Sequence, residues 1–208
     1  HRLRLRRPQR DPRARPIGGA VAPTIEQRLG GWRATANRAL TRIYGPRKGL
    51  EGFSWVEGER IAIGSLPVGD AVTRLPSLGV THVVNCRAQL QTQISNDLWA
   101  ERQVFGADHV AHAPMWDRGR PQPARLWAPA ARFAAAALDE DPHAGVLIHC
   151  QQGRRRSAMV AYAVLRLRGH DSADAARLVL ESRAPATLVP AYRASVEEWL
   201  LLIDDPLT

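Results

Sequence analysis

The amino-acid sequence predicts an α/β fold in which a central, mostly parallel sheet is flanked by helices in three layers. From residue 53 onward, short apolar strands alternate with amphipathic helices, a pattern typical of a parallel sheet with crossover helices. Residues 145–149 form an apolar strand, and the stretch 158–165 is apolar on all sides, as in a helix inside the core. With 208 residues, 45% of them apolar, the chain can form one domain with a sizeable core.

Turn residues mark the elements in the first half of this domain. A turn at Glu57 and Gly58 separates two short strands, and Asp70 is expected to cap a short helix that ends at Gly79. A buried strand, a helix and a further strand follow. In chain order, the expected strands are 55–56, 61–63, 80–85 and 109–113, and the second helix is 97–105.

Three amphipathic helices are expected around the central strand in the second half, at 123–138, 172–183 and 191–203. Pro190 suits the first position of the last helix, because that position needs no backbone N–H donor. The predicted inner faces are Leu126, Ala130, Phe133 and Ala137 in the first of these helices, and Tyr192, Val196, Trp199 and Ile203 in the last.

The N-terminal part differs in composition. Residues 1–22 are predicted as a basic disordered tail, 23–52 as a helical extension and 53–208 as the main folded domain. Most of the net charge of +9 lies in the first 16 residues, which hold seven Arg and one Asp. Such a tail either contacts polyanions weakly or is solvated without a partner. Within the extension, apolar side chains recur at helical spacing: Ile25, Leu29, Trp32, Ala36, Leu40 and Ile43.

The chain has two cysteines, Cys86 and Cys150, and so has no disulfide framework. This usage favours a reducing, cytoplasmic compartment. No apolar run approaches the roughly 20 residues that span a bilayer, so no integral membrane segment is expected. His109 and His112 lie three apart on a predicted strand and point to opposite faces, which argues against a metal site. We expect neither a metal nor another cofactor, and the sequence leaves the oligomeric state open.

Residues 146–162 have the form of an anion-binding site: a buried strand, a short loop and a helix N-terminus. Backbone N–H groups of such a loop converge on one point, and the helix dipole adds positive charge there. Cys150 begins the loop, so the same field stabilises its thiolate. Gly153 allows the tight turn. Arg156 follows six residues after the cysteine and can donate two hydrogen bonds to one phosphate.

The run His149, Cys150, five residues, Arg156, Ser157 resembles the signature of the cysteine-dependent protein tyrosine phosphatases, specifically the small dual-specificity type. The resemblance covers about residues 53–204 and includes the strand GVTHVVN, the sequence APMWDRGRP around Asp117, Arg183 and SVEEW. It implies a phosphatase-like three-layer fold and a phosphocysteine mechanism.

By this resemblance, Cys150 is the nucleophile and Asp117, 33 residues upstream, the general acid. Ser157 assists release of the sulfur, and His149 braces the loop from beneath. Residues that bind the substrate phosphate would be Gln151, Gln152, Gly153, Arg154, Arg155 and Arg156. Asp117 as a plain turn residue is the competing interpretation of that position.

Two further positions carry alternatives. Arg154 and Arg155 either favour multiply charged substrates or are solvated side chains. Cys86 resembles the backdoor cysteine of some phosphoinositide phosphatases and would form a reversible disulfide with Cys150; otherwise it is a small buried hydrophobe. Phosphorylated proteins are the expected substrates, with phosphoinositides or another non-protein phosphate as the alternative. RNA 5′ phosphates, a pseudophosphatase binding module and a different cysteine-loop enzyme are less favoured.

Overall fold

The computed structural model describes residues 52–204. The predicted tail at 1–22 lies outside this range. The predicted helical extension at 23–52, apart from Gly52, also lies outside it. Five strands form one sheet in the order β1-β2-β5-β3-β4. The strands are β1 (Phe53–Trp55), β2 (Ile61–Ser65), β3 (His82–Asn85), β4 (Val110–His112) and β5 (Val146–Cys150).

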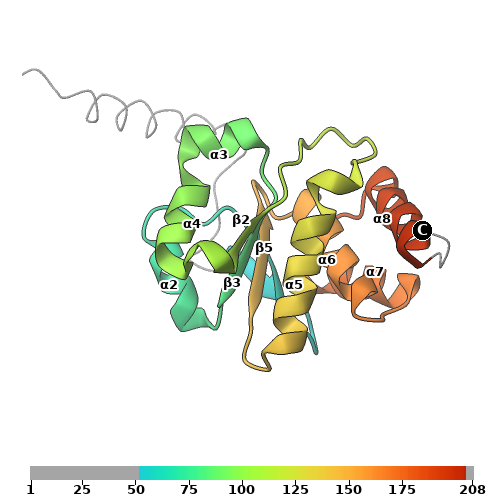
Figure 1. Ribbon diagram of the computed structural model, residues 1–208, viewed down its shortest axis with the longest axis horizontal. Helices are drawn as coiled ribbons and strands as arrows, with labels where there is room; N and C mark the ends of the chain where they lie inside the picture. The colour runs from blue at the N-terminus through green and yellow to red at the C-terminus, as the bar shows by residue number, and fades with distance from the viewer. Residues whose placement is uncertain (1–51, 205–208) are drawn as a thin grey trace, which may run out of the picture.

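The sheet is parallel except at one edge, where β1 runs antiparallel to β2 around the predicted turn. Helices cover both faces (Figure 1). One face carries α2 (Ala71–Arg74), α3 (Gln89–Ser95) and α4 (Asp97–Phe105), and the other carries α5 (Ala128–Glu140), α6 (Arg156–Leu167), α7 (Ser172–Ser182) and α8 (Pro190–Asp204). The predicted three-layer α/β fold is therefore confirmed.

The core is divided by the alternation of side chains along the central strands. Ile148 and Cys150 of β5 face the larger cluster, with α5 to α8, whereas Leu147 faces the smaller cluster toward α2 and α4. The residues 158–165 of α6 are fully buried, as their all-round apolar character predicts. This helix therefore runs through the core, and its N-terminus is fixed in place.

Several predicted details are wrong. The helix expected at 123–138 begins at Ala128, after a 3₁₀ turn at 124–126. Its buried side is formed by Ala128, Ala130, Ala131, Ala134, Ala135 and Leu138, while Phe133 and Ala137 lie at the margin. The small alanine side chains let α6 pack closely against α5. The buried face of α5 is therefore the side on which the two helix backbones come close, rather than the side with the largest apolar residues. In α8, Leu200 is buried, and Ile203, predicted to be buried, is 37% exposed.

The first half also departs from prediction in places. Asp70 precedes α2, but its side chain makes no capping hydrogen bond and pairs with Arg74 instead. His109 lies in a 3₁₀ turn before β4, so the opposite-face argument does not apply to it. Helix α3 was not predicted, because its sequence is mostly polar. Within residues 52–204, no helix is long and apolar enough to cross a membrane.

Candidate active site

The loop from Cys150 to Arg156 joins the end of β5 to the start of α6, and we call it the phosphate loop. Gly153 lies at its middle with φ of +67°, a left-handed conformation that favours glycine. A Cβ atom at this position would also lie 2.5 Å from the carbonyl carbon of Gly64 on β2. Both the turn and the close approach to β2 therefore require glycine here.

The carbonyl groups of the phosphate loop point outward. Gln151 O accepts from the Leu66 amide over 3.5 Å, and Arg154 O accepts from the Thr187 amide over 2.8 Å. Gly153 O accepts from Nε of Arg183 over 3.1 Å. Because these carbonyls are held from outside, the loop can direct its N–H groups inward, the arrangement of an anion-binding nest.

Cys150 lies at the focus of these donors and is 1% exposed. Burial alone would raise the pKa of its thiol. The Arg156 guanidinium, the hydroxyl and amide of Ser157, and the amide of Arg154 outweigh burial and lower the pKa to about 7. The Ser157 Oγ atom is 3.4 Å from the sulfur. A large share of Cys150 is therefore thiolate at neutral pH, in the state that acts as a nucleophile.

Arg156 is 3% exposed, and its guanidinium is oriented by groups far away in the sequence. Its Nη1 donates to Gln91 Oε1 over 2.9 Å and to Met115 O over 3.0 Å, and lies 3.3 Å from Cys86 O. Its Nε is buried and has no hydrogen-bond partner. A buried N–H without a partner is costly, and an anionic group in the adjacent pocket would satisfy it.

Asp117 lies on the loop 116–122, which we call the acid loop, and lines the same pocket as Cys150. Its Oδ2 is 4.0 Å from Nε of Arg156, and its Oδ1 is 3.7 Å from Nη1 of Arg155. The neighbouring Trp116 is 45% exposed at the pocket rim. The tertiary structure thus brings Asp117 to the anion site, as the resemblance implies.

His149 lies on the opposite face of β5 from Cys150, against α4. Its Nε2 is 2.9 Å from Glu101 Oε1, and both side chains are fully buried. The two atoms are close enough for an ion pair, but their orientation does not meet the geometry of a hydrogen bond. Burial lowers the pKa of His149, but the Glu101 carboxylate raises it above its usual value. The Glu101 carboxylate therefore favours the protonated form of His149 in the layer beneath the phosphate loop.

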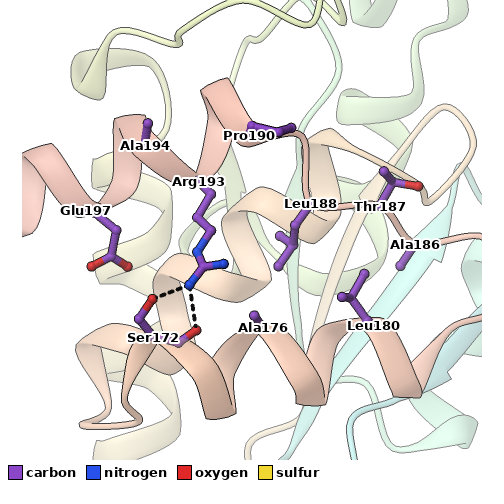
Figure 2. A pocket seen from close by; sticks show the side chains of 10 residues that line it. All are labelled: Ser172, Ala176, Leu180, Ala186, Thr187, Leu188, Pro190, Arg193, Ala194 and Glu197. Atoms are coloured by element: carbon purple, nitrogen blue, oxygen red, sulfur yellow. Dashed lines mark hydrogen bonds between the residues drawn. The ribbon is translucent and has the colours of Figure 1, made fainter.

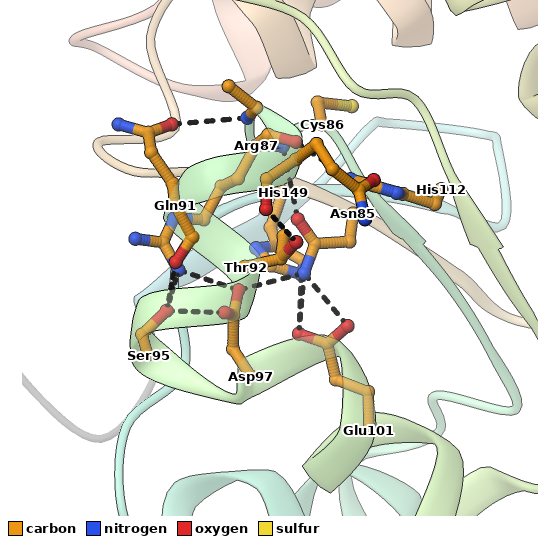
Figure 3. A network of polar contacts seen from close by, with 12 residues as sticks. Asn85, Cys86, Arg87, Gln91, Thr92, Ser95, Asp97, Glu101, His112 and His149 are labelled. Carbon is orange, nitrogen blue, oxygen red and sulfur yellow. Dashed lines mark hydrogen bonds and ion pairs between the residues drawn. The ribbon is translucent and has the colours of Figure 1, made fainter. Parts of the chain in front are cut away.

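A buried polar network surrounds this pair (Figure 3). Asn85 donates through Nδ2 to Asp97 over 2.9 Å and to Glu101 over 3.0 Å. Asp97 also pairs with the buried Arg87 over 2.7 Å. The two acids stand four residues apart on one face of α4, so a single helix supplies both counter-charges. The network fixes the ends of β3 and β5 below the candidate site.

The pocket has a volume of about 310 Å³. Its lining includes seven of the predicted site residues: Asp117, Cys150, Gln151, Gln152, Arg154, Arg155 and Arg156. Gly153 lies within the loop, Ser157 behind the sulfur and His149 beneath. Cys86 follows β3 beside the loop, where its amide donates to His149 O over 2.8 Å. Within the described part of the chain, no group of three or more His, Cys, Asp or Glu residues could hold a metal ion.

A second, more open groove of about 620 Å³ lies between α7 and α8, lined by Leu180, Leu188, Arg193 and Glu197 among others (Figure 2). Arg193 donates to the backbone and side-chain oxygens of Ser172 across it. The groove is separate from the pocket of Cys150. Thr187, in the α7–α8 connection, lines the groove and holds Arg154 O with its amide.

Sequence reasoning missed Gln91 and Glu101. Gln91 lies on the unpredicted helix α3 and orients Arg156. Glu101 lies on a predicted helix, and its spacing from Asp97 marks one acidic face, but nothing local shows that this face is buried. Arg183 belongs to the family resemblance, which assigns it no role.

Comparisons with known proteins show the fold. No family model matches the sequence, and no curated protein matches it. Among solved structures, human DUSP28 is 23% identical, with 73% of this chain and 95% of that chain covered and a TM-score of 0.57. PTPMT1 in complex with PI(5)P is 16% identical, with 76% and 100% covered and a TM-score of 0.63. A human tyrosine phosphatase-like serine/threonine/tyrosine-interacting protein is 18% identical, with 73% and 97% covered and a TM-score of 0.60.

These matches span nearly the full length of each compared chain. Residues 52–204 therefore have the fold of the dual-specificity type of cysteine-dependent phosphatases.

Proposed function

We propose that this protein is a phosphomonoester hydrolase that acts through a phosphocysteine intermediate at Cys150. One observation carries the proposal: a thiol whose pKa is lowered to about 7 lies beside the buried, unpartnered Nε of Arg156 in an open pocket. A structural cysteine in an apolar core would have a raised pKa, as burial gives to Cys86. The unpartnered guanidinium N–H supplies the matching phosphate contact.

In the first step, the Cys150 thiolate attacks phosphorus in line with the leaving oxygen. The S–P bond forms as the P–O bond breaks, and protonated Asp117 gives its proton to the leaving oxygen. Loop amides and the Nε–Nη2 edge of Arg156 hold the equatorial oxygens, where negative charge concentrates. Nη1 is occupied by protein acceptors, which fixes the direction of that edge.

In the second step, water attacks phosphorus and the S–P bond breaks. The Asp117 carboxylate takes the proton of the water, and the Ser157 hydroxyl, 3.4 Å from the sulfur, stabilises the departing thiolate. Both steps use only groups that line or adjoin one pocket, and neither requires a redox change.

We further infer that phosphorylated Tyr, Ser and Thr side chains of proteins are the substrates. The pocket is small, with a volume of about 310 Å³. At its mouth, the side chains of Trp116 and Arg155 are partly exposed. A small pocket with exposed residues at its mouth would admit short phosphorylated side chains as well as phosphotyrosine.

One observation favours phosphoinositides as the second candidate. Arg154 is exposed at the pocket, and its Nε donates to Pro185 O over 3.2 Å, which orients the guanidinium. Arg155 is also exposed, with 48% of its side chain accessible. Two oriented cations at the mouth would favour a substrate with a further phosphate near the scissile one.

Turnover of p-nitrophenyl phosphate tests the proposed function. Cys150→Ser should lower kcat by roughly 10³-fold or more, while tungstate still binds, because the loop donors remain. Wild-type turnover in this variant would contradict the proposed nucleophile. If the wild-type protein binds tungstate and phosphopeptides without hydrolysing any substrate, it is a binding module instead.

A substrate panel separates the two substrate classes. It compares phosphopeptides of three residue types with phosphoinositide vesicles, at matched phosphate concentration, for the wild type and for Arg154→Ala. Higher kcat/KM on phosphopeptides supports the protein substrates. A preference for phosphoinositides that falls in Arg154→Ala supports the alternative.

A further inference from the structure

Tyr192 of α8 is fully buried, and its hydroxyl lies inside the acid loop. The oxygen accepts a hydrogen bond from the Gly119 amide over 3.1 Å. The hydroxyl donates to Oδ1 of Asp117, also over 3.1 Å. One phenol therefore joins the backbone of the acid loop to the carboxyl group on that loop.

The direction of these hydrogen bonds follows from their chemistry. A backbone N–H can only donate, so the Tyr192 oxygen accepts from Gly119, and its single proton is left for Asp117. Burial raises the pKa of Tyr192, so the phenol keeps that proton at neutral pH. Oδ1 is thus an acceptor, and Arg155 lies on the same side, 3.7 Å away.

The other carboxyl oxygen of Asp117, Oδ2, lies on the side of Arg156. Oδ2 of Asp117 lies 4.0 Å from Nε of Arg156, toward the place of the phosphate. We propose that Tyr192 is a positioning residue for the general acid: its hydroxyl occupies Oδ1, so the transferable proton is carried on Oδ2. This inference rests on the proposed function, because it assigns the proton within the first step of that reaction.

The rest of the acid loop is held in the same position without contact to the carboxyl group. Ser195, one helical turn after Tyr192, accepts from the Gln122 amide over 3.0 Å. Gln122 Nε2 donates to Trp116 O and Arg120 O, over 3.2 and 3.1 Å. Two residues of α8 therefore fasten the loop, but only Tyr192 touches Asp117, which makes their roles separable by experiment.

The test compares Tyr192→Phe with the wild type on two substrates that differ in leaving group. Phenyl phosphate needs a proton from the acid, whereas p-nitrophenyl phosphate releases a stable anion. We expect kcat for phenyl phosphate to fall roughly 10-fold, the rate equivalent of one lost hydrogen bond. The change with p-nitrophenyl phosphate should stay within about 2-fold, and KM should change little for both.

Tyr162→Phe is the matched control. It removes the hydroxyl of the other buried tyrosine among the described residues, which donates to Glu197 and lies 3.0 Å from the Ser172 hydroxyl, away from the pocket. Its kcat should not depend on the leaving group. A second comparison places Tyr192→Phe in an Asp117→Ala background, where a residue that acts through Asp117 has nothing left to position. No further loss is expected there.

Equal losses on both substrates, or a loss that persists in the Asp117→Ala background, would overturn the inference. Failure of the proposed function looks different: the wild-type protein itself would hydrolyse neither substrate, or Cys150→Ser would be as active as the wild type. Circular dichroism and tungstate binding confirm that the Tyr192→Phe protein is folded, since phenylalanine keeps the ring that packs in the core.

Discussion

Arg183 donates through Nε to the carbonyl oxygen of Gly153 over 3.1 Å, and so joins the end of α7 to the middle of the phosphate loop. This contact holds the carbonyl group of Gly153 outward. Because the carbonyl and the N–H of a trans peptide point in opposite directions, the amide of Arg154 points inward. The Arg154 amide is one of the groups that lower the pKa of Cys150. Arg183 thus acts on the sulfur through the backbone.

Arg183→Ala should weaken the anion site while leaving the catalytic groups in place. We expect the affinity for tungstate to fall roughly 10-fold, because a peptide no longer held from outside loses its fixed orientation. Isothermal titration measures this. Arg177→Ala is the control, since Arg177 lies on α7 and pairs with Asp174 and Glu181 on the same helix. Equal affinity in both variants would contradict the role of Arg183.

The reactivity of Cys150 should rise with pH around neutrality. Because the pKa of its thiol is lowered to about 7, alkylation by iodoacetamide should reach half its maximal rate near that pH. Ser157→Ala removes a hydrogen bond that favours the thiolate, so its midpoint should move to higher pH. Stopped-flow alkylation with mass spectrometry gives both curves. A midpoint unchanged by the substitution would show that Ser157 does not act on the thiolate.

Glu101→Gln should destabilise the fold by about 3 kcal/mol, the usual loss when one partner of a buried ion pair is removed. The pKa of His149 is raised in the folded state, so the pair stabilises fully below the unfolded value of about 6.5. That contribution declines as pH rises through the folded value. Urea unfolding across this range should therefore show the largest difference between wild type and variant at low pH.

The matched control for this prediction is Glu198→Gln on the exposed side of α8. It also removes one negative charge but has no buried histidine beside it. Its effect on the free energy of unfolding should be small at every pH. A Glu101→Gln variant that loses the same stability from low to high pH would contradict the raised pKa of His149.

Mild oxidation should join Cys86 to Cys150. Asn85 pairs with His149 in the parallel sheet, and Cys86 and Cys150 are the residues that directly follow this pair along the chain. Both cysteines face the larger core cluster. Neighbouring strands lie about 4.8 Å apart, within the Cα separation that disulfides allow. Burial and the Cys150 charge raise the pKa of Cys86, so Cys150 is the thiolate that peroxide oxidises first. The Cys86 sulfur then attacks the sulfenic acid, and water leaves.

Mass spectrometry after brief peroxide treatment checks this, with activity recovered by dithiothreitol. Cys86→Ala should instead accumulate sulfinic acid at Cys150 and lose activity irreversibly. Sulfinic acid in the wild-type protein without any disulfide would mean that Cys86 is a small buried hydrophobe. The cytoplasmic compartment that the cysteine usage favours stays a prediction.

The sequence by itself determined the strand, loop and helix around Cys150, because these follow from short-range rules. An apolar strand, a glycine and an all-apolar helix lie within a few residues of one another, and each is required by local geometry and burial. The bounds of α4 were predicted correctly for the same reason. In α5 the inner face was misplaced, because alanines on several sides give no local signal of which neighbour approaches.

Only the tertiary structure decided what surrounds the loop. Gln91 reaches Arg156 across 65 residues of sequence, and Tyr192 reaches Asp117 across 75. Glu101 meets His149 only because α4 packs beneath β5. Such contacts depend on how helices from distant parts of the chain pack on one sheet, and no periodicity or motif encodes them. The sequence therefore specified the nucleophile and its anion site, whereas packing decided which residues orient the arginine, the acid and the buried charge.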